Sequence, residues 1–387
     1  MPSIASKNSW DVIVVGVGAV GSAALYQLVR RGVKVLGIDR FSPPHNRGSS
    51  HGETRITRLA LGEGAEYFQF ARRSHEIWRE LESATGRTLL RQVGGLVFGR
   101  ADAFGATHGA EDFLRTTIEV ARAHGLSHEV LEGEELRRRF PQFHWRGDER
   151  GCLEHGAGYV HPEACIAAQL EMAMRHGAQI RTGERVLGWH TSGESVEVET
   201  ERRRYRAERL ILSAGAWNPQ MAPLTPARVY RQVLFWFEPD GANEEFAPER
   251  MPVFIRLPEP GAEMFYGFPA INGAGGGMKI AAEQFEHAIE PDAMATEVTG
   301  EEVRAMHTTA APFLRISERC VRAMACKYTV MPGSRFVIDR HPESERVWVV
   351  SACSGHGFKH SAAVGEALAE MVGDGKTAYD LSAFGFR

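Results

Sequence analysis

The sequence has no excess of positive charge and no long hydrophobic run. Lysine and arginine total 45 among its 387 residues, against 49 aspartates and glutamates, which gives a formal charge of −4 at pH 7. Binding to nucleic acid requires a basic surface that neutralises phosphates, so no nucleic-acid partner is expected. No window of about 18 uninterrupted apolar residues occurs, which predicts no membrane span. The apolar stretch 12–25 is interrupted by glycines and follows Asp11, so it is interpreted as structure and not as a signal peptide.

Cysteine is scarce and irregularly placed. The five cysteines are Cys152, Cys165, Cys320, Cys326 and Cys353. An odd number at irregular spacings indicates neither a disulfide framework nor a zinc cluster, and it favours a reducing, cytoplasmic compartment. His356 and His360 have the spacing of a helical metal pair, but Gly357 between them disfavours a helix and no third ligand is evident. No metal is therefore predicted.

The remaining composition is that of a globular protein with room for two domains. Hydrophobic residues make up 43% and charged residues 24% of the chain. Helical periodicity predicts helices at about 67–82 and 162–176, and the arginine-rich segment 202–206 is interpreted as a solvated hairpin. Alternating runs between about 229 and 328 predict a mixed or antiparallel sheet that forms a substrate domain.

The N-terminal region has the pattern of a βαβ unit with a glycine-rich first turn. A nearly continuous apolar run at 11–15 precedes the turn at 16–21. A helical pattern to about residue 31 and a second apolar run at 33–38 follow, all within roughly 30 residues. This strand, turn, helix and strand order predicts a dinucleotide-binding unit.

Each glycine of the turn has a physical role in that unit. Gly16 permits the sharp turn, Gly18 lets the backbone approach a pyrophosphate, and Gly21 lets the helix pack on the strand. The anion lies at the helix N-terminus. Asp39 follows the turn by about 20 residues at a strand end, where its carboxylate accepts ribose hydroxyls and repels a 2′-phosphate. NADP is disfavoured, whereas NAD and FAD remain open.

A second apolar strand, 209–212, also closes in a turn of small residues. Ala214 and Gly215 follow it, with Trp217 next to them. Small residues let the backbone come close to a bound cofactor, so we expect this turn to contact the same dinucleotide.

Several motifs across nearly the whole chain match one protein family. They are Asp39-Arg40-Phe41, Pro43-Pro44-His45, the run Gly48 to Arg58, Tyr266-Gly267-Phe268-Pro269, Met278-Lys279-Ile280, Phe336-Val337-Ile338-Asp339, Cys326-Lys327-Tyr328-Thr329 and Ser354-Gly355-His356-Gly357-Phe358-Lys359. With these motifs the chain resembles the monomeric sarcosine oxidase and N-methyltryptophan oxidase family, which belongs to the FAD-dependent amine oxidoreductases of the DAO type. The last two motifs are the most specific.

The resemblance, together with the βαβ unit, predicts an α/β fold. It implies an FAD-binding Rossmann-like domain of the glutathione-reductase type, interleaved with a substrate domain on a mixed, largely antiparallel β-sheet. We assign residues 1–90, 151–225 and 330–387 to the FAD-binding domain. Residues 91–150 and 226–329 are assigned to the substrate domain.

The resemblance also implies a covalent flavin. In the family, the cysteine of the Cys-x-Tyr-Thr motif forms a thioether with the 8α-methyl of the flavin, so Cys326 is the implied attachment site. A covalent link prevents loss of the cofactor and raises its oxidising power. The alternative, a buried structural cysteine, is the usual state of a cytosolic thiol.

The resemblance assigns further residues to substrate and oxygen. Arg58 and Lys359 match a pair that binds the substrate carboxylate, and Lys279 matches a lysine that stabilises developing superoxide. The full set of predicted catalytic residues is Lys279, Arg58, Lys359, Tyr266, Glu283, His51 and Arg55. The predicted cofactor contacts are Gly16, Gly18, Ala19, Val20, Gly21, Asp39, Arg40, Ser50, His51, Thr54, Arg55, Val186, Ala214, Gly215, Trp217, Cys326, Gly355, His356, Gly357, Phe358 and Lys359.

One position departs from the family pattern. The sarcosine oxidases have a histidine four residues beyond the oxygen-activating lysine, whereas Glu283 stands there in this chain. A carboxylate near the substrate can bind a cationic amine or a hydroxyl, but it also favours the protonated amine, which cannot lose a hydride. The substrate is therefore left open.

These observations predict an oxidase of a secondary amino acid. Hydride transfer from the carbon next to an N-methyl or N-alkyl nitrogen reduces a covalent FAD, the imine hydrolyses, and oxygen is reduced to hydrogen peroxide. Alternatives are a cyclic imino acid such as pipecolate or proline, a glycated amino acid, or a flavin-binding subunit without its own substrate. An NAD-dependent dehydrogenase leaves the motifs at Cys326 and Lys359 unexplained. We expect a small-molecule amino acid and O2 as partners, and a monomer is slightly favoured.

Overall fold

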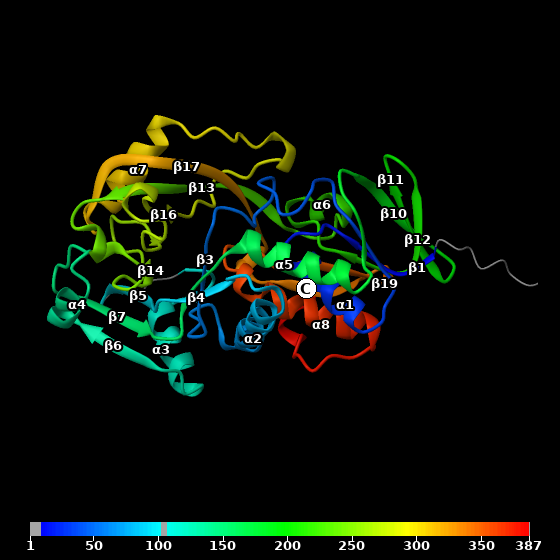
Figure 1. The fold of residues 1–387 in the computed structure, drawn as a ribbon, viewed down its shortest axis with the longest axis horizontal. Coiled ribbons are helices and arrows are strands. Elements are labelled where there is room, and N and C mark those ends of the chain that lie inside the picture. The colour runs from blue at the N-terminus through cyan, green and yellow to red at the C-terminus, as the bar shows by residue number, and fades with distance from the viewer. Residues whose placement is uncertain (1–8, 102–106, 387) are drawn as a thin grey trace, which may run out of the picture.

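A computed structural model describes residues 9–101 and 107–386 of the chain (Figure 1). Two large β-sheets organise it. The first sheet occupies the right part of Figure 1 and the second sheet the left part, with the long strands of the second sheet reaching toward the centre. The chain crosses between the two sheets several times, so segments distant in sequence form each sheet.

The first sheet has a parallel centre. Its strands are β1 (Ser9–Val15), β2 (Val35–Ile38), β9 (Gln179–Arg181), β10 (Val186–Ser192), β11 (Ser195–Thr200), β12 (Arg204–Leu212), β18 (Val337–His341) and β19 (Ser344–Ser351). The order β9-β2-β1-β12-β19 is parallel throughout, and β10, β11 and β18 add antiparallel strands. Strands β11 and β12 form the hairpin predicted at the arginine-rich segment.

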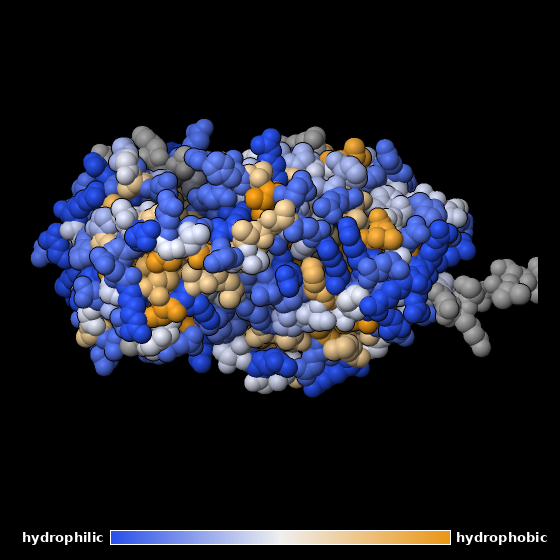
Figure 2. Space-filling model, turned by 90° about the horizontal axis from the view of Figure 1, so that it is seen from above, coloured by the Kyte–Doolittle hydropathy of each residue, from blue (hydrophilic) through white to orange (hydrophobic). Residues whose placement is uncertain are grey.

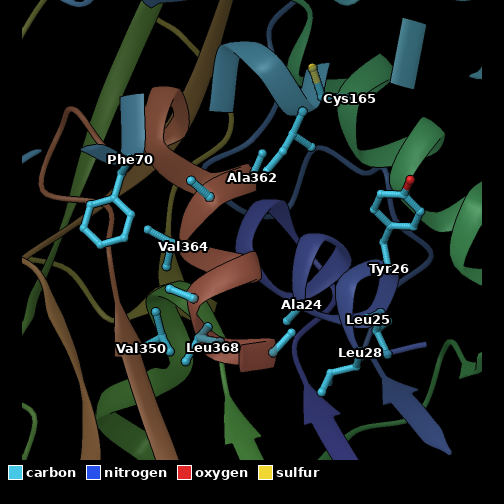
Figure 3. Packing of buried hydrophobic residues seen from close by; sticks show 14 of the residues in the cluster. Ala24, Leu25, Tyr26, Leu28, Phe70, Cys165, Val350, Ala362, Val364 and Leu368 are labelled. Carbon is cyan, nitrogen blue, oxygen red and sulfur yellow. The ribbon is translucent and has the colours of Figure 1, made fainter. Parts of the chain in front are cut away.

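Helices cover parts of both large sheets. The helices are α1 (Ala19–Arg30), α2 (Phe68–Thr85), α3 (Phe113–Ala123), α4 (Gly133–Arg139), α5 (Pro162–Arg175), α6 (Asn218–Met221), α7 (Gly300–Ala310) and α8 (Ser361–Gly373). Helix α1 packs against α5 and α8. Figure 3 shows this core, with side chains from α1, α2, α5, α8 and β19 in one hydrophobic cluster. A parallel strand covered on both faces reads as a continuous apolar run, which explains the pattern at residues 12–15.

The second sheet is mixed and largely antiparallel, as predicted. Its strands are β5 (Gly95–Arg100), β6 (His128–Glu132), β7 (Glu149–Glu154), β13 (Arg228–Pro239), β14 (Val253–Arg256), β15 (Phe265–Gly267), β16 (Met278–Ala282) and β17 (Ile316–Val330). Only β14 and β5 pair in parallel within the described part of the sheet. Residues 95–100 and 149–154 thus join the strands from the region 228–330. The sequence-based domain boundaries stay a prediction.

A small antiparallel sheet carries residues of the predicted site. It consists of β3 (Arg55–Thr57), β8 (Gly158–Val160) and β4 (Leu90–Gln92), in the order β3-β8-β4. Arg55 pairs with Val160, and Arg58 follows directly after the end of β3. This sheet therefore fixes the backbone that leads into the predicted substrate pocket.

The surface is predominantly hydrophilic. Figure 2 shows one face on which hydrophobic side chains are scattered among polar ones. The large hydrophobic side chains with the greatest exposure are Met174, Leu187, Leu224 and Phe285, which lie on separate elements and loops. No helix within residues 9–101 and 107–386 is both long and apolar enough to cross a membrane.

Candidate active site

A continuous cavity connects the glycine-rich turn with the second sheet. The first sheet contributes the turn after β1, the end of β2 and the turn after β12. The second sheet contributes side chains of β14, β15 and β17, among them Ile255, Tyr266 and Tyr328. The segment 350–359, between β19 and α8, forms a third wall. The cavity thus extends between the two sheets.

The glycine-rich turn has the geometry expected for a dinucleotide. Gly16 has a φ of +85°, and an added Cβ there would lie 2.6 Å from the Cα of Ala214. An added Cβ at Gly21 would lie 1.9 Å from the carbonyl oxygen of Gly16. At Gly18, by contrast, such a Cβ meets no described atom within 4 Å, although Gly18 lines the cavity. Gly16 and Gly21 are required by the fold, and Gly18 leaves room for a ligand.

Asp39 is fixed at the edge of the same cavity. Its two carboxylate oxygens accept hydrogen bonds from the backbone N–H groups of Val17 at 2.7 Å and Phe41 at 2.8 Å. The side chain is buried, and it lines the cavity at the end of β2. A carboxylate has about four acceptor positions, so two remain for ribose hydroxyls. The donors and acceptors of this end of the cavity fit the adenosine half of a dinucleotide.

Two glycine variants should separate folding from cofactor binding. We expect Gly21→Ala to lower thermal stability strongly or to prevent folding, because the methyl group overlaps a backbone carbonyl and overpacking costs about 1–3 kcal/mol or more. Gly18→Ala should change the melting temperature little and reduce the flavin content of the purified protein. Thermal unfolding and the visible absorbance of the flavin measure the two effects. A Gly18→Ala protein with full flavin content would contradict the assigned role of Gly18.

Arg58 and Lys359 lie together at the second-sheet end of the cavity. An unpredicted carboxylate, that of Glu63, lies between them. Arg58 Nη2 is 2.7 Å from Glu63 Oε2, and Lys359 Nζ is 2.8 Å from Glu63 Oε1. All three side chains are at most 5% exposed. Sequence reasoning missed Glu63, although its position between Gly62 and Gly64, just after Arg58, was a signal of a constrained acidic residue.

The charges of this cluster stabilise one another. Burial raises the pKa of Glu63, but the nearby charges of Arg58 and Lys359 outweigh it and hold this pKa well below its ordinary range. Burial lowers the pKa of Lys359 to about 8, against the opposing effect of Glu63. Arg58 Nε is buried and has no hydrogen-bond partner within the described chain. The cluster therefore contains two cations and one carboxylate, and the N–H group of Arg58 Nε is available to donate to a ligand.

The backbone that carries Arg58 is held by a buried carboxylate from the second sheet. Glu154, in β7, accepts hydrogen bonds from the N–H groups of Leu59 at 3.0 Å and Ala60 at 2.9 Å. Arg58 also donates to the carbonyl of Ala60, and its guanidinium lies 4.9 Å from the centre of the Phe113 ring. These contacts fix the direction of Arg58.

Lys279 does not line the cavity. It contacts residues 52–55, a segment that we call the strap and that ends at the cavity-lining Arg55. Its Nζ donates to the carbonyl oxygens of Gly52 at 2.9 Å and Thr54 at 2.6 Å. Burial, followed by the charge of Arg55, holds the pKa of Lys279 well below its ordinary value. Arg55, the next residue along the strap, lines the cavity. Lys279 is thus one peptide away from the cavity wall.

A glutamate also fixes the strap, through the backbone N–H groups of that segment. Glu163, in the first turn of α5, accepts from the N–H groups of Gly52 at 2.6 Å and Glu53 at 3.2 Å. Lys279 therefore binds carbonyl oxygens of the strap, and Glu163 binds its N–H groups. Together they fix the segment that leads into Arg55.

Cys326 is fully buried in β17, two residues before the cavity-lining Tyr328. Burial raises the pKa of its thiol, and the charge of Arg55 opposes that effect. Cys353, which sequence reasoning did not single out, lines the cavity, and its charge would further raise the pKa of Cys326. His51 is buried outside the cavity wall, with Nδ1 3.0 Å from the sulfur of Met324.

The segment from Gly355 to Lys359 lines the same cavity as the glycine-rich turn. Gly355 has a φ of +80°. His356 Nε2 lies 3.0 Å from the carbonyl oxygen of Ser334, and its ring stacks on Phe336 with 4.7 Å between centroids. Burial, with the charge of Lys359, lowers the pKa of His356 to about 3. His356 is therefore neutral at physiological pH.

Most of the predicted residues lie together on the cavity wall. Those that line it are Gly16, Gly18, Ala19, Val20, Asp39, Arg40, Ser50, Arg55, Arg58, Val186, Ala214, Gly215, Trp217, Tyr266, Glu283, Gly355, His356, Gly357, Phe358 and Lys359. The predicted residues outside the described lining are Gly21, His51, Thr54, Lys279 and Cys326. Lining residues that the sequence did not indicate include Glu63, His108, Tyr328 and Cys353.

Comparison with known proteins identifies close similarities over almost the whole chain. The family model described as FAD dependent oxidoreductase (DAO) matches residues 11–371. Monomeric sarcosine oxidase of Bacillus sp. (strain B-0618) is 37% identical over 385 residues, with 98% of this chain and 96% of the relative covered. N-methyl-L-tryptophan oxidase of Yersinia pestis (strain Pestoides F) is 32% identical over 377 residues, with 97% and 98% covered. The solved structure of NikD, an unusual amino acid oxidase essential for nikkomycin biosynthesis, superposes with a TM-score of 0.84 and 25% identity over 98% of both chains.

Proposed function

The chain belongs to the DAO family of FAD-dependent oxidoreductases, and from this premise we propose that it oxidises a secondary amino acid, with oxygen as the electron acceptor. When bound, FAD would supply the redox chemistry: two electrons and a hydrogen from the carbon next to the nitrogen would reach O2 through it, which would yield hydrogen peroxide. The resulting imine hydrolyses in water. With an N-methyl amino acid, the products are the primary amino acid and formaldehyde.

One observation carries the proposal: two buried cations lie together in the same cavity as the dinucleotide turn. Arg58 and Lys359 share the Glu63 carboxylate, and Arg58 Nε remains an open donor. A carboxylate of the substrate can accept from that donor and from the Lys359 ammonium. Fixed cations in a buried pocket favour an amino acid over an amine that lacks a carboxylate. The names of the relatives support the same class of substrate.

The remaining assignments rest on placement and resemblance. We propose that Cys326 holds the flavin covalently and that Lys279 assists the reaction with oxygen, from its position beside the strap that precedes Arg55. Neutral His356 and the backbone of Gly355 and Gly357, which line the cavity, would contact the flavin ring. The word "monomeric" in the relatives' names supports a monomer, and the five free cysteines support a reducing, cytoplasmic compartment.

Arg58→Met should reveal the carboxylate site. We expect kcat/KM for an N-methyl amino acid to fall by about 10- to 100-fold, because a charge-assisted hydrogen bond contributes about 1.5–3 kcal/mol. Oxidation of the matching N-methyl amine without a carboxylate should change far less, so the preference for the acid should shrink. Steady-state kinetics with both compounds measures that ratio.

Two further variants make this test specific. Arg115→Met removes an arginine whose side chain is 67% exposed on α3, and it should leave the ratio unchanged. Arg58→Lys keeps a charge beside Glu63 and guards against misfolding caused by an unpaired buried carboxylate. An unchanged ratio in both Arg58 variants would remove Arg58 from substrate binding.

A further inference from the structure

Two titratable side chains from distant segments meet at the cavity wall. Glu283 follows directly after β16, and His108 lies in the short segment before α3. Their nearest oxygen and nitrogen atoms are 3.4 Å apart, and the side chains are 4% and 9% exposed. Both line the same cavity as Arg58 and Lys359. They form a polar patch within the proposed substrate pocket.

Two polar atoms of this patch make no hydrogen bond. Glu283 Oε2, which lies 3.4 Å from His108 Nε2, and His108 Nδ1 are both buried, and neither forms a hydrogen bond within the described chain. The hydroxyls of Tyr266 and Tyr328, which line the same cavity, bond to each other at 2.9 Å. A buried polar atom without a partner costs about 1–3 kcal/mol, so such atoms in a pocket are suited to a ligand.

The backbone holds the patch in place. Thr107 and Ala110 pair with each other, and the turn between them has positive φ values of 49° at His108 and 81° at Gly109. Positive φ is uncommon for a residue with a side chain and often marks a functional position. Gly109 packs closely, since an added Cβ would lie 2.7 Å from the carbonyl oxygen of Gly333. The strained turn fixes the direction of the His108 ring.

A third segment packs against both side chains. An added Cβ at Gly355 would lie 2.9 Å from Glu283 Oε1 and 2.9 Å from the His108 ring. The His108 ring also meets the His356 ring edge-on, with 5.5 Å between centroids. Glycine at 355 therefore makes room for the pair, which lies next to the segment that carries Lys359.

We propose that Glu283 and His108 form a subsite for a hydroxyl group on the part of the substrate away from its carboxylate. This inference rests on the proposed function, because it takes the Arg58 and Lys359 end as the carboxylate site. The substrate would then be a secondary amino acid with a hydroxylated side chain or N-substituent. A plain hydrocarbon group of the same size would leave both polar atoms unpaired.

A hydroxyl fits the subsite better than an ammonium group. Burial raises the pKa of Glu283, against the opposing charge of His108, so its carboxyl favours the neutral form more than an exposed one does. A neutral carboxyl both donates and accepts, as a hydroxyl does. Burying an ammonium group beside it would cost far more desolvation than burying a hydroxyl. Lys359 and Arg58, in the same cavity, add further positive charge.

Matched ligands test the subsite. One series varies the side chain: N-methyl-L-homoserine, N-methyl-L-norvaline and N-methyl-L-2,4-diaminobutyrate, which end in hydroxyl, methyl and ammonium groups. A second series varies the nitrogen substituent: N-(2-hydroxyethyl)glycine, N-propylglycine and N-(2-aminoethyl)glycine. Flavin reduction is measured without oxygen. We expect the second-order rate constant of flavin reduction by the hydroxylated member of at least one series to exceed that of both others by roughly tenfold or more.

A second readout does not depend on amine oxidation. The acids 4-hydroxybutyrate and pentanoate have similar length and cannot be oxidised as amines, so calorimetric titration of the FAD-loaded protein reports binding alone. The hydroxylated acid should bind at least several-fold more tightly. If no amine reduces the flavin and this preference is nevertheless observed, the proposed function fails and the subsite stands.

Variants of Glu283 and His108 test whether these two side chains cause the preference for the hydroxylated ligand. In Glu283→Leu, and also in His108→Phe, the preference for the hydroxylated ligand should fall to within about twofold. Glu283→Gln keeps the size and a polar group, and it should fold even if the leucine variant does not, with a reduced preference. Glu286→Leu, at a side chain 86% exposed, is the matched control and should keep the full preference. Equal binding of the hydroxyl and methyl ligands by the native protein, a preference for ammonium, or a preference that survives loss of Glu283 would overturn the proposal.

Discussion

Replacing Lys279 by Met is expected to slow the reaction of the reduced protein with oxygen by about 100-fold or more, with little change in flavin reduction by substrate. A fixed cation near the site where superoxide forms stabilises the developing negative charge, and loss of such a stabilising group typically costs 10²–10³ in rate. Methionine keeps the length and most of the volume of the side chain. Stopped-flow measurement of the two half-reactions separates the effects.

The contacts of Lys279 explain why the two half-reactions should respond differently. Its amino group is buried on the strap at Gly52 and Thr54 and does not line the cavity that holds Arg58. The substrate-binding end therefore stays intact in the variant. Lys376→Met, at an exposed position, is the control and should behave as the native protein. Unchanged oxygen reactivity in Lys279→Met would remove the residue from the mechanism.

Replacing Cys326 by Ser is expected to abolish the covalent attachment of FAD. In the native protein the flavin should stay with the polypeptide after acid precipitation or denaturing electrophoresis, where its fluorescence marks the protein band. In Cys326→Ser the yellow colour should pass entirely into the supernatant, because a serine hydroxyl forms no thioether. The fraction of flavin that stays with the protein is the measurement.

Cys353 provides a demanding control for this experiment. It lines the cavity, whereas Cys326 is fully buried and does not, so accessibility alone would favour Cys353 as the attachment site. The sequence motif favours Cys326. We expect Cys353→Ser to retain covalent flavin. Loss of the attachment in Cys353→Ser, with retention in Cys326→Ser, would move the covalent site to the cavity-lining thiol.

Local sequence patterns predicted the dinucleotide-binding unit almost to the residue. The apolar run at 11–15 lies within β1, the helical pattern matches α1, and the run at 33–38 contains β2. The fold class is confirmed by the mixed second sheet and by the match to the DAO family. The strand, helix and strand of the dinucleotide-binding unit depend on residues close in sequence, and the spacing of such residues alone shows which side chains share a face.

Contacts between distant segments could not be predicted in this way. Glu63 meets Lys359 across 296 residues, and His108 meets Glu283 from a turn with no helical or strand periodicity. Only the assembled fold shows that these side chains share a cavity. Helix α8 was also missed, because it is buried nearly all round and so lacks the polar face that marks a surface helix. The family resemblance supplied Arg58 and Lys359 but not the carboxylate between them.

We expect a secondary amino acid to reduce the flavin of this protein. The most direct test is to follow the visible absorbance of the purified yellow protein without oxygen, after addition of sarcosine, bulkier N-methyl amino acids, hydroxylated N-alkyl amino acids, cyclic imino acids or glycated amino acids. We expect rapid bleaching by at least one class of secondary amino acid, and full return of the colour when oxygen is admitted. A yellow protein that none of these compounds bleaches would contradict the proposed function and would favour a flavin-binding subunit without its own substrate.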